Sequence, residues 1–288
     1  MEAPRLLFGI GATKAGTSWL YDYLRGHPEC AMPRMKELHF FNSLSEKGHA
    51  WRLKVLAGKH ADLSAKLVGA PAPRQAALTL RLDEIERYMA IVRSKDVEGY
   101  KAFLDGVRGD KALVGDVTPA YALLPEDRLS EMSKMGPAVR FIYLLRDPVD
   151  RLWSNIRMVA HRKSQANGRD VSRIANRLLD KVLSGDDKET FARSDYAGNI
   201  QRLSRAVPKS QVLIEFFETL FTPEAMTRVC DFLGIGYSEP AFAKTVHGGK
   251  ASLKLDADRR AAARHFLQPQ YDYVSARMGD VPARWQRG

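Results

Sequence analysis

The chain has 288 residues, of which 45% are hydrophobic, and its formal net charge is +11. This length and composition fit one large α/β domain with a sizeable core, and no apolar run approaches the roughly 20 residues that a membrane helix needs. The excess of positive charge favours anionic partners such as nucleotides, charged glycans, nucleic acid or a membrane surface.

The cysteine content and the distribution of charge indicate the cellular compartment and exclude some classes of partner. Two cysteines, Cys30 and Cys230, make neither a disulfide framework nor a zinc site. No signal peptide is evident, so a soluble protein of the reducing cytoplasm is expected. The basic residues are dispersed and match no nucleic-acid-binding module, so nucleic acid is not expected as a partner. The alternative is that most of these charges form a generally basic surface.

The first predicted elements are a strand over Leu6–Ile10 and a helix that follows a glycine-rich loop. Apolar residues of this helix recur at helical spacing, as Trp19, Leu20, Tyr23 and Leu24. A strand, a glycine loop and a helix in this order are typical of a phosphate site. Backbone N–H groups at the helix start converge on an anion, and the helix dipole favours its charge.

The loop Gly11–Ser18 departs from the nucleotide-triphosphatase pattern GxxxxGK[ST]. Both glycines and Ser18 fit, but Thr17 stands where the lysine belongs, and Lys14 lies three positions earlier. In that pattern the lysine contacts the β- and γ-phosphates. Its displacement therefore predicts a different anion, held nearer the strand end. The alternative is an ordinary turn with a solvated Lys14.

A second group of polar residues lies in the segment Pro33–Phe41. It places two cations, a carboxylate and an imidazole beside aromatic residues. Glu37 and His39 alternate around Leu38, so in an extended segment their side chains share a face. Such a pair is suited to acid/base chemistry. The alternative is a surface loop anchored by its two phenylalanines.

A third group follows the strongest predicted strand, Val139–Leu145. Arg146 stands at the carboxyl end of this strand, and Ser154 lies two turns into the helix that follows. Ligands of open α/β sheets bind at the carboxyl ends of the strands. A second anion site is therefore expected near the glycine-rich loop, provided that the two strands are neighbours. The alternative is a local salt bridge between Arg146 and Asp147.

The remaining pattern predicts alternating strands and helices. Further strands are expected over Cys30–Met32, Ala112–Asp116 and Val212–Phe217. Further helices are expected over Arg81–Val92, Asp127–Met135, Val171–Ser184, Tyr196–Ala206, Pro223–Leu233, Asp256–Phe266 and Gln270–Met278. The alternation predicts a parallel sheet covered by helices on both faces. Residues 1–288 are expected to form one domain, with a helical insertion at about 43–110 that shapes substrate access.

Taken together, four segments resemble motifs of the sulfotransferases that use 3′-phosphoadenosine 5′-phosphosulfate (PAPS). They are Lys14–Leu20 for the 5′-phosphosulfate loop, Lys36–Phe41, Asp116–Tyr121, and Arg146–Ser154 for the 3′-phosphate motif. The likeness is closest to the heparan sulfate N- and O-sulfotransferase branch. It covers nearly the whole chain and is weakest at 43–110. It implies a P-loop-like three-layer α/β fold with a central parallel sheet.

The resemblance also implies a reaction and its residues. A sulfuryl group would pass in line from PAPS to a hydroxyl or amine, leaving adenosine 3′,5′-bisphosphate, with no metal required. Glu37 would be the general base, Lys14 the cation at the leaving oxygen, and His39 the orienting residue or the runner-up base. The implied donor-binding residues are Lys14, Ala15, Gly16, Thr17, Ser18, Trp19, Arg146, Ser154, Tyr196, Gly249 and Lys250. Arg151 is expected to make a structural ion pair.

The acceptor is expected to be a carbohydrate or glycan. An anionic saccharide and a small molecule are both compatible with the sequence. The main alternative is a nucleotide-dependent kinase or other phosphotransferase on a similar scaffold. A third hypothesis is a basic glycan- or nucleic-acid-binding protein without turnover. The displaced Lys14 and the pair formed by Arg146 and Ser154 favour the sulfotransferase, because a 3′-phosphate is what separates PAPS from ATP.

Overall fold

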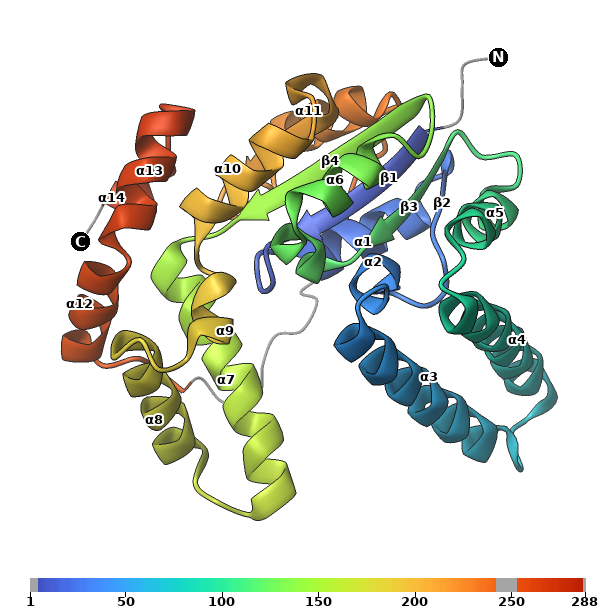
Figure 1. Ribbon diagram of the computed structural model, residues 1–288, viewed down its shortest axis with the longest axis horizontal. Helices are drawn as coiled ribbons and strands as arrows, with labels where there is room; N and C mark the ends of the chain where they lie inside the picture. Colours follow the sequence, from blue (N-terminus) through green and yellow to red (C-terminus); the bar gives the residue numbers. More distant parts are fainter. Residues whose placement is uncertain (1–4, 242–252, 287–288) are drawn as a thin grey trace.

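The computed structural model describes residues 5–241 and 253–286 (Figure 1). Its centre is a five-stranded sheet in the order β2-β3-β1-β4-β5, in which every neighbouring pair is parallel. The strands are β1 Arg5–Gly11, β2 Cys30–Ala31, β3 Leu113–Val117, β4 Ala138–Leu145 and β5 Val212–Phe216. The predicted α/β class with a central parallel sheet is confirmed.

Strand β1 lies at the centre because both of its faces are apolar. Leu7 and Phe8 have no exposed surface, as expected for a parallel strand that is covered on both sides. The Phe8 ring packs edge-on against Phe41, with the ring centroids 5.8 Å apart. This contact ties the core of the sheet to the segment that carries Glu37.

Helices surround the sheet. In chain order they are α1 Thr17–Gly26, α2 Phe40–Ser43, α3 Glu46–Leu67, α4 Ala72–Ser94, α5 Val97–Arg108, α6 Glu126–Ser133, α7 Pro148–Asn167, α8 Val171–Leu183, α9 Lys188–Ala192, α10 Tyr196–Ala206, α11 Pro223–Leu233, α12 Ala257–Phe266, α13 Gln268–Met278 and α14 Ala283–Gln286, with 3₁₀ turns η1 Pro119–Leu123 and η2 Lys209–Gln211. Figure 1 shows α1 and α6 on opposite faces of the sheet. The packed pairs α3–α4 and α7–α8 project beyond it.

The poorly patterned segment 43–110 is helical, from α2 to α5. The helix predicted over Arg81–Val92 is the second half of α4, and α3 was not predicted. Ser45 is the N-cap of α3, since its hydroxyl oxygen accepts a hydrogen bond from the Gly48 N–H at 3.2 Å. The role of this segment in substrate access stays a prediction.

The strand order creates a topological switch point at the carboxyl edge of the sheet. The connection from β1 passes β3 to reach β2, whereas the connection from β3 passes β1 to reach β4. The chain therefore leaves β1 and β3 in opposite directions, and ligands of open α/β sheets bind at such a point. The loops that follow these two strands contain Lys14 and Thr118.

Candidate active site

The loop after β1 presents an uncapped helix start. Gly16 precedes α1 with a φ of 91°, and a Cβ there would lie 2.9 Å from Cδ2 of Phe217, so glycine fits both the left-handed backbone and the close approach. No side chain caps α1, and no acidic residue lies in its first turn. The positive end of the α1 dipole is thus left for an external anion.

Lys14 lies in this loop within a group of positive charges. Burial lowers the pKa of the Lys14 ammonium, and the neighbouring cations lower it further. We call this group the cation cluster; its members are Lys14, Lys36, Arg146, Arg157 and Arg162. Like charges gathered around one ammonium disfavour its charged form, so a multiply charged anion would relieve their repulsion.

The second predicted anion site lies beside the first, because β4 pairs directly with β1. Nη1 of Arg146 donates to the Lys14 carbonyl oxygen at 3.2 Å, and the guanidinium lies 4.7 Å from the centre of the Phe217 ring. The Tyr196 hydroxyl donates to the Arg146 carbonyl at 2.8 Å and accepts from its N–H at 3.2 Å. Tyr196 is fully buried, so its effect on a nucleotide would pass through Arg146.

Helix α7 continues this second site. Asp147 caps it, accepting from the Asp150 N–H at 2.9 Å, and also accepts from the Tyr271 hydroxyl at 2.8 Å. Among the described residues no ion pair joins Asp147 to Arg146, so the local salt bridge is not formed. Ser154, predicted to bind the 3′-phosphate, lies two turns along α7 and is 7% exposed.

The ion pair predicted for Arg151 is wrong. Its side chain is fully buried, and Nη2 donates to the Ser194 hydroxyl oxygen. Its Nε and Nη1 have no hydrogen-bond partner within the described ranges. Burial lowers the pKa of this guanidinium to about 10. Arg151 is therefore a buried cation held by a hydroxyl group instead of a carboxylate.

The predicted acid/base pair is connected to the donor loop by Lys36. Its Nζ donates to the Ser18 hydroxyl oxygen at 2.7 Å and lies 3.3 Å from Oε1 of Glu37. Oε2 of Glu37 lies 3.6 Å from Nε2 of His39, whose Nδ1 lies 3.1 Å from Oδ1 of Asn42. Sequence reasoning placed Lys36 in a motif but assigned it no role, whereas the structure gives it contacts on both sides of the site.

The backbone of this segment is not extended, contrary to the reasoning from alternation. Glu37 has a φ of 61° and His39 a φ of 56°, and the two side chains meet all the same. Among the described residues other than glycine, positive φ occurs at Lys14, Glu37, His39 and Lys95. Three of these four are the predicted catalytic residues. Left-handed backbone is costly for such residues and gathers at functional sites.

Asp116 at the end of β3 holds the strained segment in place. Its buried carboxylate accepts from the hydroxyls of Tyr100, Tyr121 and Thr118 at 2.7 to 2.9 Å. It also accepts from the Leu38 N–H at 3.4 Å. Four donors on one buried carboxylate compensate for its loss of water. The motif Asp116–Tyr121 thus has a structural task that sequence reasoning did not assign.

Glu37 is ionised and accessible. Burial acts to raise the pKa of its carboxyl group, but the contact with His39 and the charge of Lys36 outweigh burial and hold the pKa at about 2. The side chain is 42% exposed. A substrate can therefore reach a carboxylate that is ionised at neutral pH.

Sequence reasoning also missed an aromatic residue beside this pair. Trp51, on α3, is 46% exposed, and its ring meets the His39 ring edge-on with the centroids 4.9 Å apart. Nothing in the sequence indicated it, because α3 itself was not predicted. Arg157 was findable in principle, since it lies three residues after Ser154, one turn along α7.

The other predicted donor-binding residues differ in their placement. Ala15 and Thr17 are buried at the start of α1, and Trp19 packs its ring against Tyr23 and Phe221. Gly249 and Lys250 lie outside the described residues. Within the part of the chain that is described, no group of three or more His, Cys, Asp or Glu residues is placed to hold a metal ion. Nor does that part contain a helix long and apolar enough to cross a membrane.

Comparison with known families shows the family to which this chain belongs. The sequence model of the sulfotransferase family matches residues 4–239. The chain belongs to the sulfotransferase family. It is accordingly a transferase, and sulfuryl transfer is the reaction of the family.

One solved sulfotransferase structure shares the fold, and two others are also similar to this chain. The crystal structure of the sulfotransferase from Alicyclobacillus acidocaldarius is 22% identical, with a TM-score of 0.64 over 100% of both chains. The sulfotransferase domain from the curacin biosynthetic pathway is 15% identical, with a TM-score of 0.47 over 98% of this chain and 99% of that one. The domain from the Synechococcus PCC 7002 olefin synthase is 17% identical, with a TM-score of 0.39 over 92% and 96%. Comparison with curated proteins gives no match.

Proposed function

We propose that this sulfotransferase moves the sulfuryl group of PAPS to a hydroxyl or amine, with Glu37 as general base. The observation that carries the proposal is the connection through Lys36. Its ammonium contacts the donor loop at Ser18 and the carboxylate of Glu37. Donor site and base are therefore held within one side chain of each other, as an in-line transfer requires.

The donor would bind along the cation cluster. The uncapped start of α1, with Gly16, Thr17 and Ser18, would receive the 5′-phosphosulfate, and Arg146 with Ser154 the 3′-phosphate. Charge-assisted hydrogen bonds of this kind contribute roughly 1.5–3 kcal/mol each. Tyr196 would act by fixing the backbone of Arg146.

The transfer step uses two residues in opposite roles. The acceptor oxygen or nitrogen forms a bond to sulfur while the bond from sulfur to the bridging oxygen of the 5′-phosphate breaks. Negative charge grows on that bridging oxygen, and the Lys14 ammonium would stabilise it. The proton lost by the acceptor would pass to the carboxylate of Glu37. His39, in contact with Glu37, would orient it.

The acceptor side of the site is formed by Glu37, His39 and Trp51. An exposed tryptophan beside an acid/base pair offers a flat apolar face to a ring, which supports a carbohydrate or glycan acceptor. Membership of the heparan sulfate branch and a cytoplasmic location remain proposals on sequence grounds. The kinase alternative has less support, because the family match is to sulfotransferases and Thr17 replaces the lysine of the triphosphatase loop.

The proposal is tested by an acceptor screen with PAPS carrying labelled sulfate. With an accepted substrate, Lys14→Ala and Glu37→Gln should each lower kcat by about 10²- to 10⁴-fold while the circular dichroism stays that of the parent chain. Asp127→Asn, an exposed carboxylate on α6, is the matched control and should keep the parent rate. Full activity of Glu37→Gln with loss in His39→Ala would transfer the role of base to His39.

A further inference from the structure

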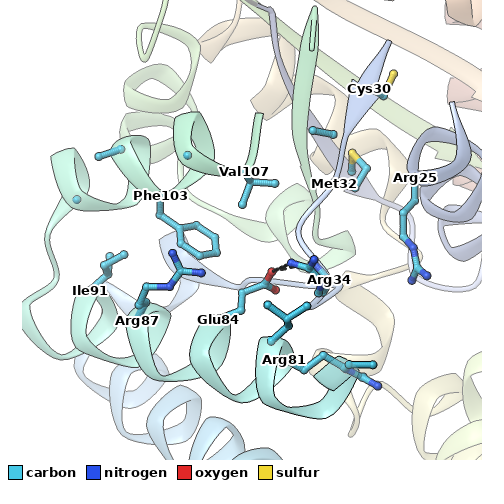
Figure 2. Close-up of a pocket in the computed structure, with 16 residues that line it drawn as sticks. Arg25, Cys30, Met32, Arg34, Arg81, Glu84, Arg87, Ile91, Phe103 and Val107 are labelled. Carbon is cyan, nitrogen blue, oxygen red and sulfur yellow. Dashed lines mark hydrogen bonds and ion pairs between the residues drawn. The ribbon is translucent and has the colours of Figure 1, made fainter. Parts of the chain in front are cut away.

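A cavity lies at the edge of the sheet, and the candidate active-site residues do not line it. It has a volume of about 890 Å³ and is bounded by α4, α5, the end of α1 and strand β2. Figure 2 shows the side chains that line it. We call it the edge groove. None of the residues that line it belongs to the cation cluster or to the acid/base pair.

One end of the edge groove is cationic. Four arginines line the whole groove against one acid, Glu84. Glu84 is 3% exposed and already engaged, since its carboxylate accepts from the backbone N–H groups of Arg34 and Met35 at 3.2 and 2.9 Å. It also pairs with the Arg34 guanidinium at 3.7 Å. Figure 2 shows Arg25, Arg34 and Arg81 gathered at the same end. Arg81 has no ion pair with any residue that the structure describes, so its guanidinium is available to a ligand.

The other end of the edge groove is apolar. Phe103 and Val107 of α5 and Ile91 of α4 lie there, with Arg87 beside them (Figure 2). Small residues of α5 widen this end, because a Cβ at Gly106 would meet nothing within 4 Å. A purely polar ligand would leave this wall unused. A purely apolar one would have to bury unpaired guanidinium groups, which is unfavourable.

The edge groove is separate from the donor site along α1. The helix starts beside Gly16 in the donor loop and reaches Arg25 eight residues later, about 12 Å along its axis. The two sites are nevertheless joined through the backbone, because Glu84 fixes Arg34 and Met35 directly before Lys36.

We propose that the edge groove binds an amphipathic anion, with an alkyl or acyl chain on the apolar wall and a phosphate, sulfate or carboxylate head on Arg25 and Arg81, beside the ion pair of Arg34 with Glu84. Guanidinium groups match such heads with paired hydrogen bonds. The ligand binds as a free amphiphile within a groove of limited length. Binding in the edge groove requires no transfer activity, so its failure would not contradict the proposed reaction.

Calorimetric titration of the whole chain with dodecyl phosphate, kept below its micelle concentration, tests the proposal. Arg81→Ala and Arg25→Gln should each raise the Kd by about tenfold. Arg93→Ala, an exposed arginine of α4 outside the groove, is the matched control and should leave the Kd unchanged. Ala102→Trp, which fills the apolar end, should abolish binding.

Three further titrations identify the binding site and the part of the ligand that is recognised. Inorganic phosphate should bind at least about tenfold more weakly than dodecyl phosphate, because burial of the chain adds affinity. Neutral dodecyl maltoside should not bind, and Lys14→Ala should leave the Kd for dodecyl phosphate unchanged. Equal effects of Arg81→Ala and Arg93→Ala would overturn the proposal. So would loss of binding in Lys14→Ala, or binding only to vesicles of phosphatidylglycerol.

Discussion

At the scale of single residues, the site combines opposite charges in a fixed order. Lys14 is surrounded by cations that lower its pKa, so it gains most when a highly charged anion arrives. Glu37 is held in its ionised form by Lys36 and His39 despite its burial. Lys36 contacts both Ser18, in the proposed donor loop, and the carboxylate of Glu37. The same cation would therefore influence donor binding and the proton affinity of the proposed base.

The protonation state of Glu37 gives a prediction for the pH dependence. A base works in its ionised form, and the pKa of Glu37 is lowered to about 2. The kcat/KM of the parent chain should therefore show no acid limb above about pH 4, since this quantity reports the free enzyme.

Lys36→Ala is the companion variant. Removing this positive charge raises the pKa of Glu37, so the acid limb should move upward toward the ordinary glutamate value of about 4.3. Arg93→Ala should leave the profile in place. An acid limb near neutral pH in the parent chain, absent from a His39→Asn variant, would show that Glu37 is not the base.

At the scale of elements, the end of β3 fixes the geometry of the segment that contains Glu37, the proposed base. Asp116 anchors the segment of Glu37 and His39 through the Leu38 N–H, and the Thr118 hydroxyl oxygen accepts from the His39 N–H at 3.3 Å. The Tyr88 hydroxyl donates to the Leu38 carbonyl at 2.8 Å. These contacts stabilise the positive φ angles of Glu37 and His39, which would be unfavourable in an unsupported loop.

Asp116→Asn tests this support. The amide offers donors where the carboxylate only accepts, so buried hydroxyls of Tyr100 and Tyr121 lose a partner. We expect the free energy of unfolding, measured in urea, to fall by about 2 kcal/mol. We also expect a lower kcat with little change in donor affinity. Asp127→Asn should change neither quantity, and an unaltered kcat in Asp116→Asn would refute the support role.

Helix α3 brings an exposed tryptophan to the acid/base pair, and this gives a prediction about the acceptor. Trp51→Ala should raise the KM for the acceptor by about threefold to tenfold, because a stacking contact is lost, while the KM for the donor stays constant. Val68→Ala, which truncates a residue that is 84% exposed, is the control. An unchanged acceptor KM would remove Trp51 from the acceptor site.

The elements also show how far the sequence could predict this structure. The strands were visible because their apolar runs are short, buried and bounded by glycine or proline, and β1 and β4 differ from prediction only at their ends. Helix α3 was missed because only Arg52, Leu56 and Leu63 of its 22 residues are buried. The contact of Glu37 with His39 was predicted for the wrong reason, since it depends on left-handed backbone that no periodicity reveals.

At the scale of the whole molecule, the strand order 2-3-1-4-5 brings distant segments to one edge. It places Lys14, Thr118 and Arg146 after three adjacent strands, although up to 132 residues separate them. This adjacency could be expected from the α/β pattern and the two anion motifs. The extension of the cation cluster to Arg162 could not, because this residue joins it only through the direction that α7 takes from β4.

The central claim is that this site recognises a nucleotide with a 3′-phosphate, and binding measures it without knowledge of the acceptor. Isothermal titration should show tighter binding of adenosine 3′,5′-bisphosphate than of ADP with Mg²⁺. Arg146→Ala should weaken the bisphosphate by about tenfold or more and leave the weak ADP binding nearly unchanged. Tighter binding of ADP with Mg²⁺ in the parent chain would contradict the account.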